Sequence, residues 1–160
     1  MVPRDELEAV LAVINLLAKY ADCIDTDALE QWPDMFTERC VYKITTAENQ
    51  ARGLPIGILY ADSRAMLKDR VKALRDANIY EPQRYRHIIS AVCITERDGA
   101  IFGARSNFLV VRTTADGTQD LFAAGCYIDR VDFSGDRPRF AEKLVVLDSD
   151  KVDTLLAIPL

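Results

Sequence analysis

The second half of the chain contains the feature that most limits its fold: long strand-like segments separated by tight turns. Asp98-Gly99 and Asp116-Gly117 are dipeptides typical of two-residue hairpin turns, and "SGD" at 134–136 makes a third, less sharp turn. The flanking segments run at about 85–97, 100–114, 118–133 and 139–148. Because strands joined by tight turns are antiparallel neighbours, we predict a four-stranded meander.

The first half of the chain is instead predicted to be mainly helical. Asp27 and Glu30 have the spacing of an acidic capping box, which indicates a second, short helix anchored by Trp32 and Phe36. It follows one long amphipathic helix from about 5 to 25. Its predicted buried face consists of the apolar residues that recur at helical spacing: Leu7, Val10, Leu11, Ile14, Leu17, Ala18 and Ala21.

A strand and a third helix complete the first half. Cys40, Tyr42 and Ile44 alternate with more polar neighbours, as in a strand, and the segment "ENQARGLPIG" that follows them is typical of a loop. Ser63 can cap a helix that runs to about Ala77. Its predicted apolar stripe is Met66, Leu67, Val71 and Leu74.

The third predicted helix is strongly basic. Its cationic residues most simply form a solvated face, paired in part with Asp69 and Asp76, and the alternative is a surface for an acidic partner. The cationic residues concerned are Arg64, Lys68, Arg70, Lys72 and Arg75.

Helices followed by a meander define an α+β fold in which the helices cover one face of the sheet. Gly103 and Gly125 lie inside predicted strands, where glycine often marks a bend or bulge. A strongly bent sheet around helices suggests a cone, whose apolar interior either holds a small ligand or is filled by side chains. We expect residues 1–160 to form a single domain.

Charge and cysteine usage exclude several classes of protein. The net charge of -5 argues against a nucleic-acid binder, which needs a basic face. No apolar run is long enough to span a membrane and the first residues lack a signal core, so we expect a soluble, cytoplasmic protein. The four cysteines form no Cys-x-x-Cys pair, and we expect buried, reduced thiols with at least three on core-facing positions: Cys23, Cys40, Cys93 and Cys126.

The chain contains one histidine, His87, and this number limits its metal chemistry. Non-haem oxygenase iron is commonly held by two histidines and a carboxylate, and a Rieske cluster by two histidines and two cysteines. We therefore predict no metal site. No nucleophile elbow, Walker loop or dinucleotide fingerprint is present either, so we predict no catalytic residue of those kinds.

General acid–base chemistry is the alternative that the residues leave open. His87 paired with Asp22 or Asp25 could act in a small dehydratase or isomerase. Tyrosines at 42, 85 and 127 could then orient a substrate, and Arg84 with Arg86 could bind its carboxylate. The simpler interpretation is that His87 is part of the structural frame. A ligand-binding module with an open apolar pocket is the third possibility.

Several stretches, in this order, resemble the small, or β, subunits of aromatic ring-hydroxylating (Rieske non-haem iron) dioxygenases. They are "YADCIDTDALEQWPDMFTERCVY", "ADSRAMLKDRVKALRDANIYEPQRYRHIIS", "SNFLVVRT", "AAGCYIDRV" and "EKLVVLDSDKVDTLLAIPL". The likeness extends from about Leu16 to Leu160. "TDALEQWPDMF", "GILYADSRAMLKDR" and "DTLLAIPL" are most similar to the subunits for terephthalate, then to those for salicylate and anthranilate.

The resemblance implies an NTF2-like (cystatin-like) cone that assembles with a large, or α, subunit, typically as α3β3. The α subunit would hold the Rieske [2Fe–2S] cluster and the mononuclear Fe(II), and a reductase would deliver electrons from NADH. Arg84, Tyr85, Arg86 and His87 would then belong to the frame or to a subunit interface, with His87 and Asp25 as an acid–base pair in the alternative. The apolar tail "TLLAIPL" could contact the partner or pack back on its own cone.

Overall fold

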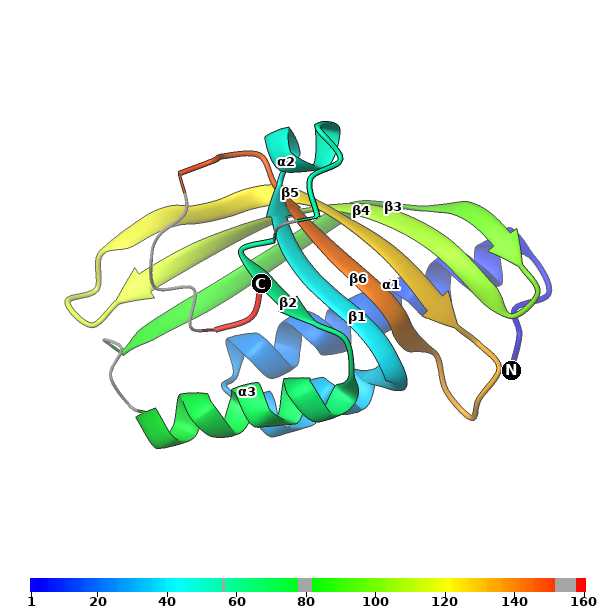
Figure 1. The fold of residues 1–160 in the computed structure, drawn as a ribbon, viewed down its shortest axis with the longest axis horizontal. Helices are drawn as coiled ribbons and strands as arrows, with labels where there is room; N and C mark the ends of the chain where they lie inside the picture. The colour runs from blue at the N-terminus through cyan, green and yellow to red at the C-terminus, as the bar shows by residue number, and fades with distance from the viewer. Residues whose placement is uncertain (56, 78–81, 152–157) are drawn as a thin grey trace.

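The computed structural model describes residues 1–55, 57–77, 82–151 and 158–160. Within them, helices cover one face of a curved six-stranded sheet, so the predicted α+β class is confirmed. In the view of Figure 1, α1 and α3 lie below the sheet and the short helix α2 lies above it. The order of strands across the sheet is β2-β1-β6-β5-β4-β3.

Helix α1 (Glu6–Asp25) begins where predicted, with the Asp5 side chain accepting a hydrogen bond from the backbone N–H of Glu8. The predicted buried face is wrong by part of a turn. Leu7 and Leu11 are 68% and 51% exposed, and Ile14 is exposed as well. The sheet instead covers a neighbouring stripe that includes the large ring of Tyr20, and this stripe is Ala9, Val13, Leu16, Leu17, Tyr20, Cys23 and Ile24.

The second helix is present but is a 3-10 helix, η1 (Leu29–Met35), with Trp32 fully buried. The predicted capping box is wrong. Asp27 adopts a left-handed backbone conformation (φ 59°), and the Ala28 N-cap makes no side-chain hydrogen bond. The carboxylates of Asp27 and Glu30 bind Arg75 of α3 instead, at 2.8 and 2.7 Å. The carboxylates of Asp27 and Glu30 therefore join the η1 region to α3, and they do not cap η1.

The predicted strand is β1 (Phe36–Thr46), which is longer than the alternation around Tyr42 suggested. The segment predicted as a loop contains helix α2 (Ala47–Ala51), capped by Thr46. Strand β2 (Leu59–Ala61) follows and pairs antiparallel with β1, so two short elements were missed. Both elements are shorter than the window of residues over which hydrophobic periodicity can be recognised.

Helix α3 (Arg64–Ala77) follows Ser63, whose hydroxyl accepts a hydrogen bond from the N–H of Met66 at 3.3 Å. Leu67 and Val71 of the predicted stripe are buried and Leu74 packs partly against the core, but Met66 is exposed. Two of the basic residues pair across the fold with residues other than those expected. Arg75 binds Asp27 and Glu30, and Arg64 binds Glu38 at 2.6 Å and the carbonyl of Phe36.

The meander is confirmed as four antiparallel strands. They are β3 (Gln83–Asp98), β4 (Ile101–Thr114), β5 (Gln119–Asp132) and β6 (Arg139–Leu147). Gly99 and Gly117 of the turns have positive φ, as a two-residue hairpin requires. One pair departs from the expected antiparallel sheet: β1 lies parallel to β6, with Ile44 beside Val145.

Both strand glycines lie where another chain segment comes close. A Cβ on Gly125 would lie 1.9 Å from the backbone oxygen of Val146 in β6. A Cβ on Gly103 would lie 2.5 Å from the Glu96 side chain, next to an irregularity in the β3–β4 register. The predicted association of these glycines with bends or bulges therefore holds for Gly103, and Gly125 permits close approach of neighbouring backbone.

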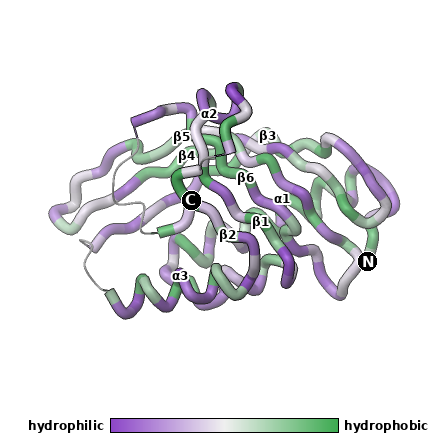
Figure 2. Tube along the Cα trace, viewed as in Figure 1, coloured by the Kyte–Doolittle hydropathy of each residue, from purple (hydrophilic) through white to green (hydrophobic). Residues whose placement is uncertain are grey.

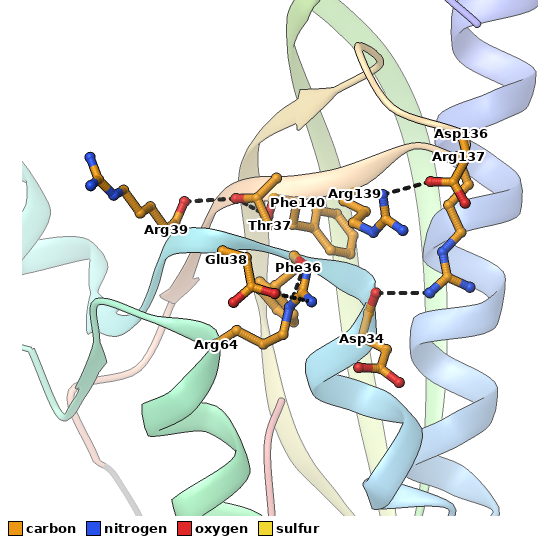
Figure 3. Close-up of polar contacts among 10 residues, drawn as sticks. All are labelled: Asp34, Phe36, Thr37, Glu38, Arg39, Arg64, Asp136, Arg137, Arg139 and Phe140. Carbon is orange, nitrogen blue, oxygen red and sulfur yellow. Dashed lines mark hydrogen bonds and ion pairs between the residues drawn. The ribbon is translucent and has the colours of Figure 1, made fainter.

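The entry to β1 is fixed by side chains from three elements, which Figure 3 draws. Arg64 of α3 contacts the Phe36 carbonyl and the Glu38 carboxylate, and Arg137 from the β5–β6 turn donates to the carbonyl of Asp34 at 3.4 Å. These contacts hold η1, α3 and the sheet in one arrangement around Phe36, which is fully buried.

The core lies between the inner face of the sheet and the helices. Hydrophobic and hydrophilic residues alternate along the strands in Figure 2, as expected where one face is buried. The end of the chain packs into the same region: Ile158 and Leu160 are buried, and the Leu160 carbonyl accepts from the hydroxyls of Tyr20 and Tyr42. This part of the apolar tail packs back on its own cone, whereas residues 154–157 lie outside the described residues.

Candidate functional site

The end of α1 and the start of β3 meet at His87. Its ring nitrogen Nδ1 lies 2.6 Å from Oδ1 of Asp25, and its backbone N–H donates to Oδ2 at 2.9 Å. The imidazole is fully buried and the Asp25 side chain is 6% exposed. An ionised carboxylate only accepts hydrogen bonds, so this contact places the proton of a neutral His87 on Nδ1 and leaves Nε2 as an acceptor.

The structure thus selects Asp25 over Asp22 as the carboxylate beside His87. The Nε2 atom is buried and has no hydrogen-bond partner within the described residues. The rings of Tyr85 and His87 meet edge to face at 6.3 Å. The hydroxyls of Ser106 and Tyr127, which are cross-strand neighbours on β4 and β5, are likewise buried without a partner in the described part of the chain. The cone therefore has unsatisfied polar groups on its inner wall.

The other three residues of this predicted group divide between the two faces of β3. Tyr85 and His87 point inward and are buried, whereas Arg84 and Arg86 alternate with them and are exposed. Alternation in a strand makes this division obligatory. Asp25 thus ties the inner side of β3 to α1, while the two arginines lie on the opposite surface.

A second buried ionic pair was not predicted. Lys143 of β6 lies 3.1 Å from Asp129 of β5, and both side chains are essentially inaccessible to water. Burial raises the pKa of the Asp129 carboxyl to about 6 and lowers the pKa of the Lys143 ammonium to about 8, while each partner opposes the shift of the other. Alternation in "CYIDRV" and "AEKLVV" could have placed both residues on the inner face.

Aromatic rings surround the Lys143 ammonium. Its Nζ lies 3.6 Å from the ring centroid of Tyr127, 4.6 Å from that of Tyr20 and 4.5 Å from that of Phe140. The rings come from α1, β5 and β6, so the cation joins the helix layer to the sheet. Such a desolvated cation–π arrangement partly replaces lost hydration.

A hollow of about 730 Å³ lies elsewhere, between α1, η1 and the β5–β6 turn. Its lining includes Asp22, Cys23, Asp34 and Arg137 but neither Asp25 nor His87. The hollow is open to solvent and mixed in polarity. This hollow therefore does not reach the Asp25–His87 pair, whose imidazole is buried.

The residues of this chain do not fit the metal groups of a ring-hydroxylating oxygenase. Both the Rieske cluster and the mononuclear iron require two histidines, and the chain has only His87, which is engaged with Asp25. Among the described residues, no three His, Cys, Asp or Glu side chains gather as metal ligands would. We therefore assign no metal-dependent step to this chain.

The cysteines differ in part from the expectation of three core-facing thiols. Cys23 and Cys40 are buried, Cys126 is half-buried and Cys93 is exposed. Burial raises the pKa of Cys23 to about 12 and that of Cys40 to about 11, so both thiols stay protonated at neutral pH. No helix in the described part of the chain has the length and apolar character that crossing a bilayer requires.

Comparison with known proteins identifies the family. Residues 19–154 match the model of the ring-hydroxylating β subunit. The chain belongs to this family of dioxygenase β subunits. The β subunit 1 of the terminal oxygenase component of terephthalate 1,2-dioxygenase from Comamonas is 44% identical to it, over 96% of this chain and 98% of the relative. The anthranilate 1,2-dioxygenase small subunit from Burkholderia cepacia is 41% identical, over 98% and 97%.

A solved structure agrees with this assignment. A protein described as the β subunit of an aromatic-ring-hydroxylating dioxygenase from Novosphingobium aromaticivorans superimposes with a TM-score of 0.88 at 38% identity, covering 95% of this chain and 97% of that one. The resemblance found in the sequence and the NTF2-like cone that it implied are confirmed. This β subunit is thus part of an oxidoreductase complex, in which an α oxygenase subunit is the partner.

Proposed function

We propose that this β subunit is a structural component of an oxygenase that acts on an aromatic carboxylate, with terephthalate as the first candidate. The proposal rests on the relatives at 44% and 41% identity, whose names give terephthalate and anthranilate, both benzene rings that bear carboxylates. The β subunit contributes architecture. The α subunit holds the Rieske [2Fe–2S] cluster and the mononuclear Fe(II), which supply electron transfer and oxygen activation.

The same proposal covers the rest of the assembly. The complex is α3β3, receives electrons from NADH through a reductase and works in the cytoplasm. The single histidine supports this division of labour, because the imidazoles that both metal centres need must come from another chain.

The test is coexpression of the chain with the α subunit encoded with it. Size-exclusion chromatography with light scattering gives the stoichiometry, and product formation from terephthalate, phthalate, benzoate and anthranilate gives the substrate class. We expect a 3:3 complex that turns over an aromatic carboxylate only when both subunits and a reductase are present. A chain that never co-purifies with the α subunit, or that oxidises an arene alone, would refute the assignment.

We infer one second candidate function, proton transfer by Asp25 and His87, because the imidazole has its Nδ1 fixed by a carboxylate and its buried Nε2 makes no hydrogen bond within the described residues. In this alternative the chain is a stand-alone dehydratase or isomerase of the same fold. The competing interpretation is that the pair only joins α1 to β3, since Asp25 also accepts the backbone N–H of His87.

An isotope-exchange assay separates these two roles. The chain alone is incubated with 2-indanone, an enolisable ketone, in D2O, and deuterium uptake is followed by NMR. A proton-transfer site predicts uptake that His87→Ala and Asp25→Asn abolish while a surface control, Lys72→Ala, keeps it. If the Asp25–His87 contact is only structural, the parent and all three variants should show background exchange. His87→Ala and Asp25→Asn should then have lower melting temperatures than the parent.

A further inference from the structure

The outer face of strands β3, β4 and β5 presents large apolar side chains to solvent. Ile88, Leu121 and Ile128 are 51%, 64% and 41% exposed. The strand register places Ile88 beside Leu109 and Leu121 beside Val111, so these residues share the surface that faces away from α1. We define these five residues as the centre of the open sheet face.

Arginines accompany this centre. Arg84 and Arg86 precede Ile88 on the same face of β3, and Arg105 lies beside Ile128 in the register of β4 and β5. All three are exposed, and none makes an ion pair within the described residues. The surface is locally cationic although the chain has a net charge of -5.

Acidic side chains are absent from the same rows of the described sheet. The row of Arg84 continues through Thr113 and Gln119, and that of Arg86 through Val111 and Leu121. The row of Arg105 continues through Cys93 and Ile128. Nearer the β3–β4 turn, Glu96 lies 3.9 Å from Arg130, and at the β4–β5 end Asp120 pairs with Arg112, so neither carboxylate reaches Arg84, Arg86 or Arg105. The arginines of the open sheet face are therefore left for an external partner.

The arginines on the open sheet face distinguish between the possible binding partners. A second copy of this chain docked through the same face would place arginines against arginines without compensation. A partner with an apolar centre and acidic side chains around it would neutralise them and remove the exposed apolar surface from water. The buried centres of protein interfaces are more apolar than the rest of the surface, and arginine is enriched in interfaces, so this composition is consistent with a docking surface.

We propose that the open sheet face is the docking surface for the α subunit, and that the α subunit meets it with an apolar patch surrounded by carboxylates. This inference rests on the proposed function, because it requires an α partner. It also accounts for the Asp25–His87 contact. By tying the inner side of β3 to α1, that contact fixes the strand from which Arg84 and Arg86 project.

The competing surface is the apolar stripe of α1 formed by Leu7, Leu11 and Ile14. This stripe provides a matched control, because Leu11 and Ile88 are each 51% exposed. Lys72 on α3 is exposed like Arg86 and provides the control for charge reversal. The experiment therefore compares Ile88→Glu with Leu11→Glu, and Arg86→Glu with Lys72→Glu.

Each variant is coexpressed with the affinity-tagged α subunit encoded with this chain, and Kd is measured by biolayer interferometry. Circular dichroism and melting temperature verify that each variant folds. We expect Ile88→Glu and Arg86→Glu to weaken binding by about tenfold or more, and the two controls to stay within about twofold of the parent. For Arg86→Glu the defect shrinks at about 0.5 M salt, because screening weakens its new repulsion.

The outcomes are separable. If the parent chain does not bind the α subunit, the proposed function fails. If the parent binds and both open-face variants bind as tightly, this inference is overturned and the proposed function stands. Loss of binding in Leu11→Glu alone assigns docking to α1 and overturns it too. So does self-association of the parent chain that Ile88→Glu abolishes, since the occupant is then a second copy.

Discussion

Replacing Lys143 by methionine is the sharpest test of the energetics inside the cone. Lys143→Met keeps most of the side-chain volume but leaves the buried Asp129 carboxylate without its cation, 3.1 Å away in the parent. Removing one partner of a buried ion pair typically costs 3–5 kcal/mol. We therefore expect the free energy of unfolding at pH 7 to fall by about 4 kcal/mol.

The pH dependence of this loss follows from the remaining carboxyl. Burial already raises the pKa of Asp129 to about 6, and Lys143, which opposes that shift, is gone in the variant. The folded variant then binds more protons than the unfolded chain from about pH 4 to above 6, so its stability falls as pH rises through this window. Within this window, each unit by which the pH is lowered should restore up to about 1.4 kcal/mol.

Urea denaturation at pH 5 and pH 7 measures both effects, provided that the m-value is unchanged. The double variant Asp129→Leu/Lys143→Met removes both charges and should lie within about 1 kcal/mol of the parent. A loss below about 1 kcal/mol for Lys143→Met at pH 7, or additive losses in the double variant, would contradict a desolvated, mutually dependent pair.

Three further predictions concern other parts of the fold. Gly125→Ala should destabilise the chain by about 3 kcal/mol or more in urea denaturation, because its Cβ would overlap the neighbouring backbone of β6; Gly53→Ala, at positive φ with nothing within 4 Å of its Cβ, gives for comparison the cost of backbone strain without overlap. Tyr42→Phe should cost about 1–2 kcal/mol and speed carboxypeptidase release of the last residues, because its hydroxyl bonds both the N–H and the carbonyl of Leu160. Hydrogen bonds from the Arg75 guanidinium hold the pKa of Glu30 at about 2. The difference in free energy of unfolding between the parent and Glu30→Gln should therefore be complete above pH 4.5 and vanish towards pH 2. A difference that does not change with pH would disprove that contact.

The turns and the strand pattern could be predicted from the sequence, because they depend on local residue preferences that recur along the chain. The Asp-Gly turns specified the hairpins of the meander through their demand for positive φ. Strand alternation could also have separated Tyr85 and His87 from Arg84 and Arg86, but these four residues were predicted as one group of frame or interface residues. Short elements such as α2 and β2 were missed, since five and three residues carry too little pattern. The resemblance to dioxygenase β subunits came from the order of several motifs over most of the chain.

The candidate site was only half predictable. A single histidine limited the metal chemistry, and Asp25 was one of two carboxylates named beside it. Which of the two reaches His87 depends on how α1 is rotated against β3, and the same rotation decided that Leu11 is exposed. That angle is set by packing around large rings such as Tyr20, not by the spacing of apolar residues along the helix.

The sequence by itself therefore determined the order of the main elements, the hairpin turns and the donor inventory, all of which depend on local backbone preference or on counting. Tertiary structure alone decided the parallel contact of β1 with β6, the pairing of Asp129 with Lys143 and, among the described residues, the exposure of the open sheet face. These depend on which distant segments come together. Such contacts are chosen by the free energy of burying the whole chain at once, which no local pattern encodes.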